Sequence, residues 1–158
     1  MDVFILLDID GVLNRETDVP APATFSELLT SEDIDPAAVQ SLNALVKVTE
    51  ARIIIASSWR LHHSVPELSS LLGERGLSGE IIGATPKMSG ESRGVEIRTW
   101  LMANARSNAA FVVLDDQAPS AGLDPHWVRT DPSLGLLERD SALAAKILSL
   151  PSALAVDR

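Results

Sequence analysis

The sequence predicts an α/β domain with a mostly parallel β-sheet and helices on both of its faces. Three short runs of branched apolar residues carry this prediction, at 3–7, 53–56 and 111–114. Each run is continuous rather than alternating, which is typical of strands that are covered on both faces. Helical patterns lie between the runs, and this alternation indicates a layered sheet with right-handed crossovers.

The first predicted strand, at 3–7, is followed by a helix that begins near residue 36. Asp35 and Pro36 combine a capping side chain with a proline that suits the first helical turn. The apolar residues after them recur at helical spacing and share one face of that helix. These residues are Val39, Leu42, Leu45 and Val46.

Weaker signals extend the alternation through the rest of the chain. A short helix is expected within 65–72, and further strands are expected at 81–82 and 127–129. Two serines are expected to cap the remaining helices. Ser92 precedes a helix with Ile97, Trp100 and Leu101, and Ser141 precedes one with Leu143, Ile147 and Leu148.

The length, charge and cysteine content of the chain exclude several classes of protein and of functional site. The chain has 158 residues, so we expect a single domain over 1–158. Its 13 basic and 22 acidic residues give a formal charge of −9, which disfavours non-specific binding to nucleic acid but allows a local basic pocket for one phosphate. The absence of cysteine excludes disulfides, thiolate zinc sites and cysteine nucleophiles.

The pattern of apolar residues argues against membrane insertion. No apolar run approaches the roughly 18 to 20 residues that span a bilayer. Acidic residues interrupt the N-terminal apolar stretch, unlike a secretory signal, so we expect a cytoplasmic protein with no membrane partner. The segment 18–24 holds two prolines and is expected to form an extended surface loop.

Polar side chains follow each of the three strong strands at the point where it ends. Asp8 and Asp10 follow the first strand, Ser57 follows the second, and Asp115 and Asp116 follow the third. The carboxyl ends of parallel strands meet at one edge of a sheet, where ligands of such folds bind. The sequence therefore predicts four carboxylates and a hydroxyl around one crevice.

Such a cluster suits phosphoryl transfer. Carboxylates this close repel one another, and Mg²⁺ is a hard cation that binds a few carboxylates together with phosphate oxygens. Of two carboxyls spaced as in Asp8 and Asp10, one can attack phosphorus while the other exchanges protons with the leaving oxygen and with water. A positive side chain is also needed beside the transferred group, and Lys87 and Arg93 both precede the third strand.

The motifs resemble those of a known family. The segment 8–14, Asp-Ile-Asp-Gly-Val-Leu-Asn, resembles the first signature of the haloacid-dehalogenase-like (HAD) phosphohydrolases. Ser57 resembles the second signature and the pair 115–116 the fourth, in the same order along the chain. The segments 56–60 and 93–97 are similar to the HAD domains of "Swiss army knife" RNA-repair proteins and to the phosphatase half of polynucleotide kinase-phosphatases.

The resemblance implies a role for each matched residue. Asp8 would be the nucleophile and a Mg²⁺ ligand, forming an aspartyl-phosphate. Asp10 would be the general acid and base, with its backbone carbonyl on the metal. Ser57 would hold the phosphoryl group. Asp116 would bind the metal directly, and Asp115 would support it.

The cation of the third signature has two candidates. Lys87 has the more usual side chain, but Arg93 fits the sequence context better and is preferred. Ser58, Arg60 and Asn14 are expected to contact the substrate.

The resemblance also implies a Rossmann-like HAD fold with a minimal cap. The segment between the first two signatures, 14–52, is too short for a large lid domain once its helix is subtracted. An open site would suit a bulky substrate such as a nucleic-acid end or a phosphoprotein, unless a partner subunit covers it. The expected partner is a phosphorylated substrate, either a small molecule or a nucleic-acid end.

Other interpretations remain. A non-catalytic receiver-like signalling module also uses an acidic cluster, but its phosphoacceptor aspartate ends the middle strand, where this chain has Ala56-Ser57. A carbon–halogen hydrolase needs no metal and would have no use for Asp10 together with Asp115 and Asp116. Trp59 is expected to pack in the core, with stacking on a nucleic-acid base as the alternative.

Overall fold

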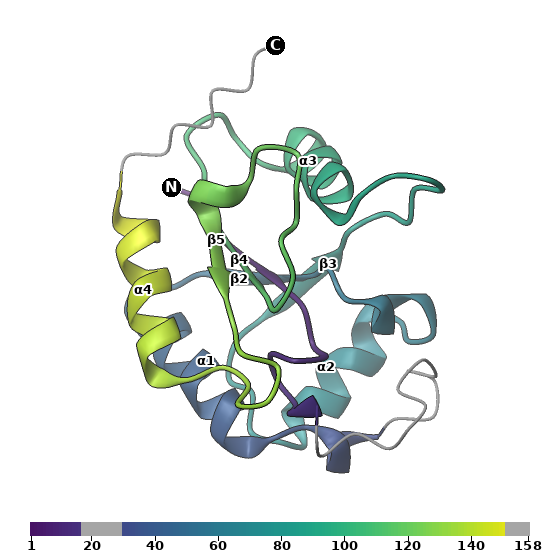
Figure 1. Cartoon of the computed structure of the whole chain (residues 1–158), viewed down its shortest axis with the longest axis vertical. Helices are drawn as coiled ribbons and strands as arrows, with labels where there is room; N and C mark the ends of the chain where they lie inside the picture. The colour runs from purple at the N-terminus through teal and green to yellow at the C-terminus, as the bar shows by residue number, and fades with distance from the viewer. Residues whose placement is uncertain (17–29, 151–158) are drawn as a thin grey trace.

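The computed structural model of the chain describes residues 1–16 and 30–150 (Figure 1). Its centre is a five-stranded sheet in which every neighbouring pair of strands is parallel. The spatial order is β3-β2-β1-β4-β5. The strands are β1 (Val3–Leu7), β2 (Arg52–Ile55), β3 (Ile81–Ala84), β4 (Ala110–Asp115) and β5 (Trp127–Arg129). The prediction of a parallel α/β sheet is therefore confirmed, whereas the predicted loop at 18–24 lies outside the described residues.

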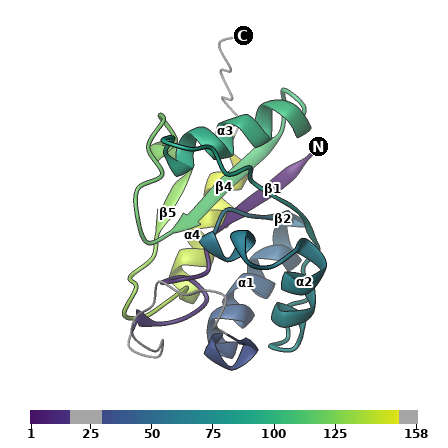
Figure 2. The same ribbon diagram turned by 90° about the vertical axis from the view of Figure 1, so that its right-hand side faces the viewer.

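Helices cover both faces of this sheet, as the sequence predicted. Helices α1 (Pro36–Thr49), α2 (Val65–Gly73) and α4 (Glu138–Ser149) pack on one face, and α3 (Arg93–Asn104) packs on the other (Figure 2). Alternate side chains of each strand enter the two cores: Ile5 and Leu7 face the three-helix side, while Phe4 and Leu6 face α3. Both faces are buried, which explains why the strands are continuously apolar.

Local capping explains where two of the helices begin. The Asp35 carboxylate accepts a hydrogen bond from the Ala37 amide at 2.9 Å, and Pro36 occupies the first turn of α1. The Ser92 hydroxyl accepts from the Val95 amide at 3.3 Å and caps α3. Both caps are as predicted.

The prediction for α4 is wrong in its details. The helix begins at Glu138, ahead of Ser141, and the Asp140 carboxylate binds the Leu137 amide at 2.9 Å. Ser141 is buried inside the helix, and its hydroxyl donates to the Ser41 carbonyl of α1 at 2.7 Å. Leu143 is 48% exposed, whereas Ala144 and the predicted Leu148 are buried in the core and the predicted Ile147 packs against it.

The order of the strands positions the functional residues. The chain moves outward from β1 through β2 to β3, and then crosses back to place β4 on the other side of β1. Asp8 follows β1 directly and Asp115 ends β4, so both lie at the point where the strand order reverses. Open α/β sheets bind their ligands at such switch points.

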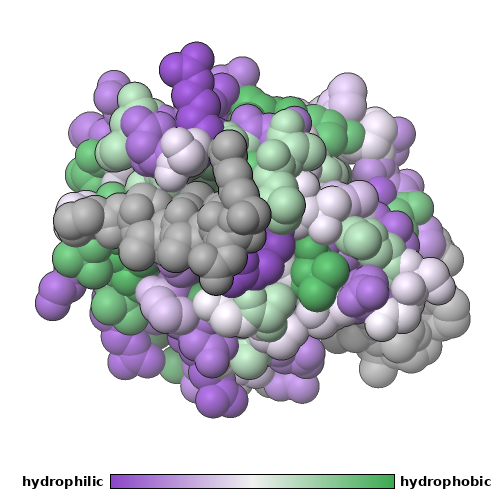
Figure 3. Space-filling model, turned by 90° about the horizontal axis from the view of Figure 1, so that it is seen from above, coloured by the Kyte–Doolittle hydropathy of each residue, from purple (hydrophilic) through white to green (hydrophobic). Residues whose placement is uncertain are grey.

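The surface is mixed in character. On the face seen in Figure 3, hydrophilic and apolar residues are interspersed. Within residues 1–16 and 30–150, no helix combines the length and the apolar character that crossing a bilayer requires.

Candidate active site

Three carboxylates meet at the switch point. Asp8, Asp115 and Asp116 each offer an oxygen, and the three oxygens lie within 4.8 Å of one another. Asp8 and Asp115 are buried, and Asp116 is partly exposed. The predicted meeting of the first and third strand ends is therefore found. The Asp10 carboxylate lies outside this group of three but lines the same cleft.

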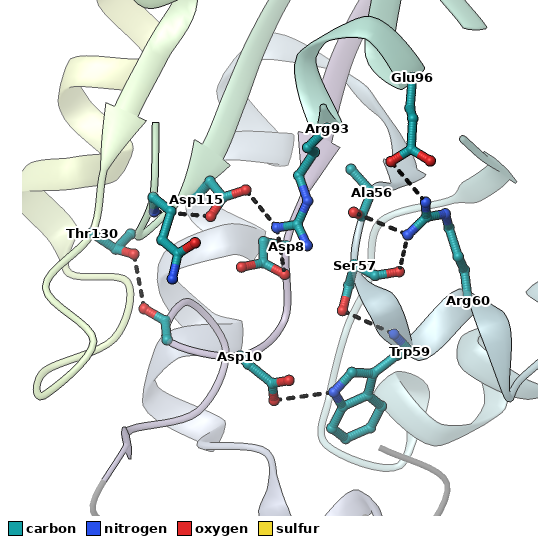
Figure 4. Close-up of polar contacts among 12 residues, drawn as sticks. Asp8, Asp10, Ala56, Ser57, Trp59, Arg60, Arg93, Glu96, Asp115 and Thr130 are labelled. Atoms are coloured by element: carbon teal, nitrogen blue, oxygen red, sulfur yellow. Dashed lines mark hydrogen bonds and ion pairs between the residues drawn. The ribbon is translucent and has the colours of Figure 1, made fainter. Parts of the chain in front are cut away.

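Arg93 supplies the positive charge at this cluster. Its Nη1 lies 2.6 Å from Asp115 Oδ2 and 3.3 Å from Asp8 Oδ1, and Figure 4 shows the guanidinium reaching from the start of α3 toward both carboxylates. Lys87, the other predicted candidate, is exposed and is absent from the residues that line the cleft. The geometry thus places Arg93, and not Lys87, beside the acids.

One arginine does not neutralise the cluster. Burial raises the pKa of Asp8 well above its ordinary value; the charge of Asp115 adds to this effect, while Arg93 opposes it. Burial and the neighbouring Asp115 also raise the pKa of Asp116. Burial by itself would lower the pKa of the Arg93 guanidinium, but the charges of Asp8 and Asp115 outweigh it and raise that pKa.

The donor set fits a hard divalent cation. Three carboxylates and one guanidinium leave a formal charge of two negative, in a site whose ligand atoms are all oxygen. Both oxygens of Asp115 already have partners, since Oδ2 binds Arg93 and Oδ1 accepts from the Gln117 amide at 3.0 Å. Asp116 instead lines the cleft together with Asp8, so these two carboxylates are more accessible to an ion in the cleft than that of Asp115.

The loop after β1 depends on a glycine for its approach to Asp116. Gly11 has φ +79, and a Cβ at this position would lie 2.9 Å from Asp116 Cγ. Its carbonyl accepts from Thr130 Oγ1 at 2.8 Å, and its amide donates to Asn14 Oδ1 at 2.9 Å. The loop is therefore held on both sides while passing close to the cluster, a path that favours glycine.

Two side chains hold the carboxylate of Asp10. Asn14 Nδ2 donates to Asp10 Oδ1 at 2.9 Å, and the indole Nε1 of Trp59 donates to the same oxygen at 3.1 Å. Asn14 was predicted to contact the substrate, yet it is buried and both ends of its amide bind within this loop. Trp59 is fully buried, which confirms the prediction that it packs in the core.

The two serines after β2, Ser57 and Ser58, differ in burial and in their contacts. Ser57 is fully buried, and its hydroxyl accepts from the Trp59 amide at 3.2 Å, capping the short 3₁₀ helix Ser58–Leu61. Ser58 is exposed and lines the cleft, where its predicted contact with substrate is geometrically possible.

Arg60 does not take the place that the sequence predicted for it. Its guanidinium donates to the carbonyls of Ser57 and Thr85 at 2.8 Å and 2.9 Å, and to Glu96 Oε1 at 3.1 Å. Its side chain is 6% exposed and is absent from the cleft lining, so we correct its assignment from substrate contact to structural support. Through these contacts, Arg60 connects the ends of β2 and β3 to α3, the helix that carries Arg93.

The cleft encloses a cavity of about 570 Å³ that is open to solvent. The lining residues are Asp8, Asp10, Gly11, Asn14, Glu16, Ser58, Arg93, Asp116, Gln117, Arg129 and Pro132. Sequence reasoning missed Arg129 and Gln117 as site residues. Their positions in the sequence could have indicated this, because both lie at the carboxyl ends of predicted strands. Arg129 ends the predicted strand at 127–129, and Gln117 directly follows the acidic pair.

Comparison with known proteins adds one further observation. A family model described as "HAD domain in Swiss Army Knife RNA repair proteins" matches residues 4–141. Apart from Val3, the first residue of β1, the matched stretch includes the five strands and every residue that lines the cleft. No curated protein and no solved structure shows significant similarity to the chain.

Proposed function

The chain belongs to the family of HAD domains found in Swiss Army Knife RNA repair proteins, and on this basis we propose that it is a Mg²⁺-dependent phosphomonoester hydrolase that acts through an aspartyl-phosphate on Asp8. One observation carries the proposal. The buried Asp8 carboxylate, at the end of the central strand, faces both a guanidinium and a second acid from β4. This is the arrangement that a nucleophilic carboxylate needs beside a transferred phosphoryl group.

In the first half-reaction, an oxygen of Asp8 attacks phosphorus and the bond from phosphorus to the leaving oxygen breaks. Asp10 gives its proton to that oxygen, so the product leaves as an alcohol and Asp10 becomes a carboxylate. In the second half-reaction, Asp10 takes a proton from water as the water oxygen attacks phosphorus. The bond between phosphorus and Asp8 breaks, which releases orthophosphate and regenerates both side chains.

The other residues of the cluster would hold the metal and the phosphoryl group. Asp8, Asp116 and the Asp10 carbonyl would bind Mg²⁺ directly, and Asp115 would support them while it orients Arg93. When bound, the ion supplies positive charge that offsets the carboxylates and the phosphoryl oxygens. Arg93 would neutralise the charge of the aspartyl-phosphate, and the Ser57 hydroxyl would donate to a phosphoryl oxygen.

The proposed substrate is a phosphorylated small molecule or a nucleic-acid end, and the open cleft supports this proposal. The cavity of about 570 Å³ admits a phosphorylated small molecule or a nucleic-acid end. We further propose that residues 1–158 form one such domain and that the protein acts in the cytoplasm.

The experiment is a phosphate-release assay with and without Mg²⁺, first on p-nitrophenyl phosphate. We expect Asp8→Asn to lower turnover below detection, while Asp124→Asn, at an exposed aspartate away from the cluster, leaves it unchanged. Undiminished release by Asp8→Asn would exclude Asp8 as the nucleophile. Stoichiometric phosphorylation without turnover would instead favour the receiver-like alternative.

A substrate panel then separates the classes. It contains 5′- and 3′-phosphorylated oligonucleotides, mononucleotides, phosphopeptides and sugar phosphates. Selective release from oligonucleotide ends would support a nucleic-acid substrate, and selectivity for sugar phosphates would reject it.

A further inference from the structure

The indole of Trp59 is bonded to the side chain that the proposed reaction uses as its proton donor. Trp59 is 0% exposed, and its Nε1 donates to Asp10 Oδ1 at 3.1 Å (Figure 4). A buried indole N–H needs an acceptor, but a backbone carbonyl would serve that need equally well. Complete burial also excludes Trp59 from stacking on a substrate base.

A second donor converges on the same oxygen. Asn14 Nδ2 lies 2.9 Å from Asp10 Oδ1. The orientation of the Asn14 amide is fixed, because its own Oδ1 accepts from the Gly11 amide at 2.9 Å. Asp10 Oδ1 therefore receives two N–H groups, and neither of these nitrogens can act as an acceptor for a proton on that oxygen.

This arrangement distinguishes the two oxygens of Asp10. With two N–H donors on Oδ1, a proton on the carboxyl group resides on Oδ2. Asp10 lines the cleft, and in the proposed reaction the proton on Oδ2 is the one given to the leaving group.

We infer that Trp59 is a positioning residue for proton transfer: its indole N–H, together with Asn14, holds Asp10 so that Oδ2 delivers the proton to the leaving oxygen. The inference rests on the proposed function. In the proposed reaction, Trp59 contacts neither the substrate nor the metal and acts only through Asp10.

The inference has a kinetic signature that a purely structural role lacks. An alkoxide is a poor leaving group and needs its proton as the bond to phosphorus breaks, whereas p-nitrophenolate leaves without one. Misplacing the proton donor therefore slows alkyl phosphates more than p-nitrophenyl phosphate. General damage to the site slows both alike.

The experiment measures kcat/KM of the full chain with Mg²⁺ on p-nitrophenyl, phenyl and alkyl phosphates. We expect Trp59→Phe to lower the value about tenfold for the alkyl phosphate and less than about threefold for p-nitrophenyl phosphate. The matched control is Trp100→Phe, because Trp100 is on α3 and packs edge-on against Phe4 at 5.3 Å. We expect no dependence on the leaving group there. Equal losses across the series with Trp59→Phe would overturn the inference.

Two further variants keep the test decisive. Replacing Trp59 with 3-benzothienylalanine substitutes sulfur for the N–H and keeps the bicyclic ring, so the core stays filled if phenylalanine unfolds the protein. In an Asp10→Asn background, either change at position 59 should have no additional effect on any substrate, since the residue acts only through Asp10. Losses that multiply in the double variant would contradict the inference.

The two proposals fail in different ways. If the unmodified protein shows no release that depends on Asp8, the proposed function fails and this inference falls with it. If release depends on Asp8 but changes at Trp59 affect all leaving groups equally, only this inference fails.

Discussion

The guanidinium of Arg93 and the carboxylate of Asp115 lie 2.6 Å apart, where the first turn of α3 meets the end of β4. The contact joins the helix on one face of the sheet to a strand inside it. The same guanidinium nitrogen lies 3.3 Å from Asp8. Arg93 is therefore held over the proposed nucleophile by an acid that is itself buried.

This contact predicts which cation acts in the reaction. We expect Arg93→Ala to lower kcat/KM by roughly a hundredfold to a thousandfold, because it removes the charge beside Asp8. Lys87→Ala should stay within about twofold of the unmodified protein, since Lys87 lies outside the cleft lining. Arg93→Lys should recover part of the loss. A larger loss at Lys87 than at Arg93 would overturn the assignment.

The raised pKa of Asp8 predicts that the metal-free protein becomes less stable as the pH rises. An aspartate in the unfolded chain titrates near pH 3.9, below the value of the folded site. The folded state therefore holds the proton more tightly, and this contribution to stability is complete below about pH 4. It is lost as the pH rises through the raised pKa of folded Asp8, and Asp116 adds an effect of the same sign.

Added Mg²⁺ should reverse this loss, because the ion binds the deprotonated carboxylates. We expect Mg²⁺ to raise the melting temperature more at about pH 7.5 than at about pH 5, measured by thermal unfolding. Asp8→Asn should flatten the pH dependence of the metal-free protein and reduce the shift caused by Mg²⁺. Equal shifts at both pH values would contradict the prediction.

Gly94 is predicted to be essential for the position of α3. A Cβ at this residue would overlap the carbonyl oxygens of Pro119 and Ser120 in the loop after β4. We expect Gly94→Ala to destabilise the protein by about 1–3 kcal/mol and to lower kcat by moving Arg93. Gly73→Ala is the control, because a Cβ there meets nothing within 4 Å, and it should be neutral or stabilising by up to about 1 kcal/mol. Denaturant unfolding measures both, and similar effects would refute the steric argument.

The buried ion pair between Arg60 and Glu96 is predicted to matter for stability. Their side chains are 6% and 5% exposed and lie 3.1 Å apart. Removal of one partner therefore leaves the other charge buried without its ion-pair partner. We expect Glu96→Ala to cost about 3–5 kcal/mol in the free energy of unfolding. Asp2→Ala breaks the more exposed pair with Arg52 and should cost at most about 1 kcal/mol. Comparable losses of free energy of unfolding in the two variants would show that burial does not determine how much each ion pair contributes to stability.

The strand ends could be predicted from the sequence because two independent signals coincide there. Continuous apolar runs mark the buried strands, and a parallel sheet brings their carboxyl ends to one edge. These two facts suffice to place Asp8 beside the pair Asp115 and Asp116, although at least 107 positions separate Asp8 from that pair along the chain. The helix caps at Asp35 and Ser92 were predictable for a similar reason, since capping is local.

Tertiary contacts account for the errors. Arg60 lies close to the site in the sequence, but only the fold shows that Glu96 and two carbonyls occupy its guanidinium. Ser141 has the side chain of a helix cap, yet a carbonyl of α1, 100 positions earlier, takes its hydroxyl instead. No local pattern reports such partners, and the same is true of the bond from Trp59 to Asp10.

The pairing of β4 with β1 determines when the acidic cluster can form during synthesis of the chain. Residues 3–7 and 110–115 become neighbours only when the chain has been synthesised past its fourth strand, β4, and has folded back on itself. Before that moment a nascent polypeptide presents Asp8 alone, without the two acids that complete the triad. The three-carboxylate cluster proposed to bind Mg²⁺ therefore forms only once β1 and β4 have paired.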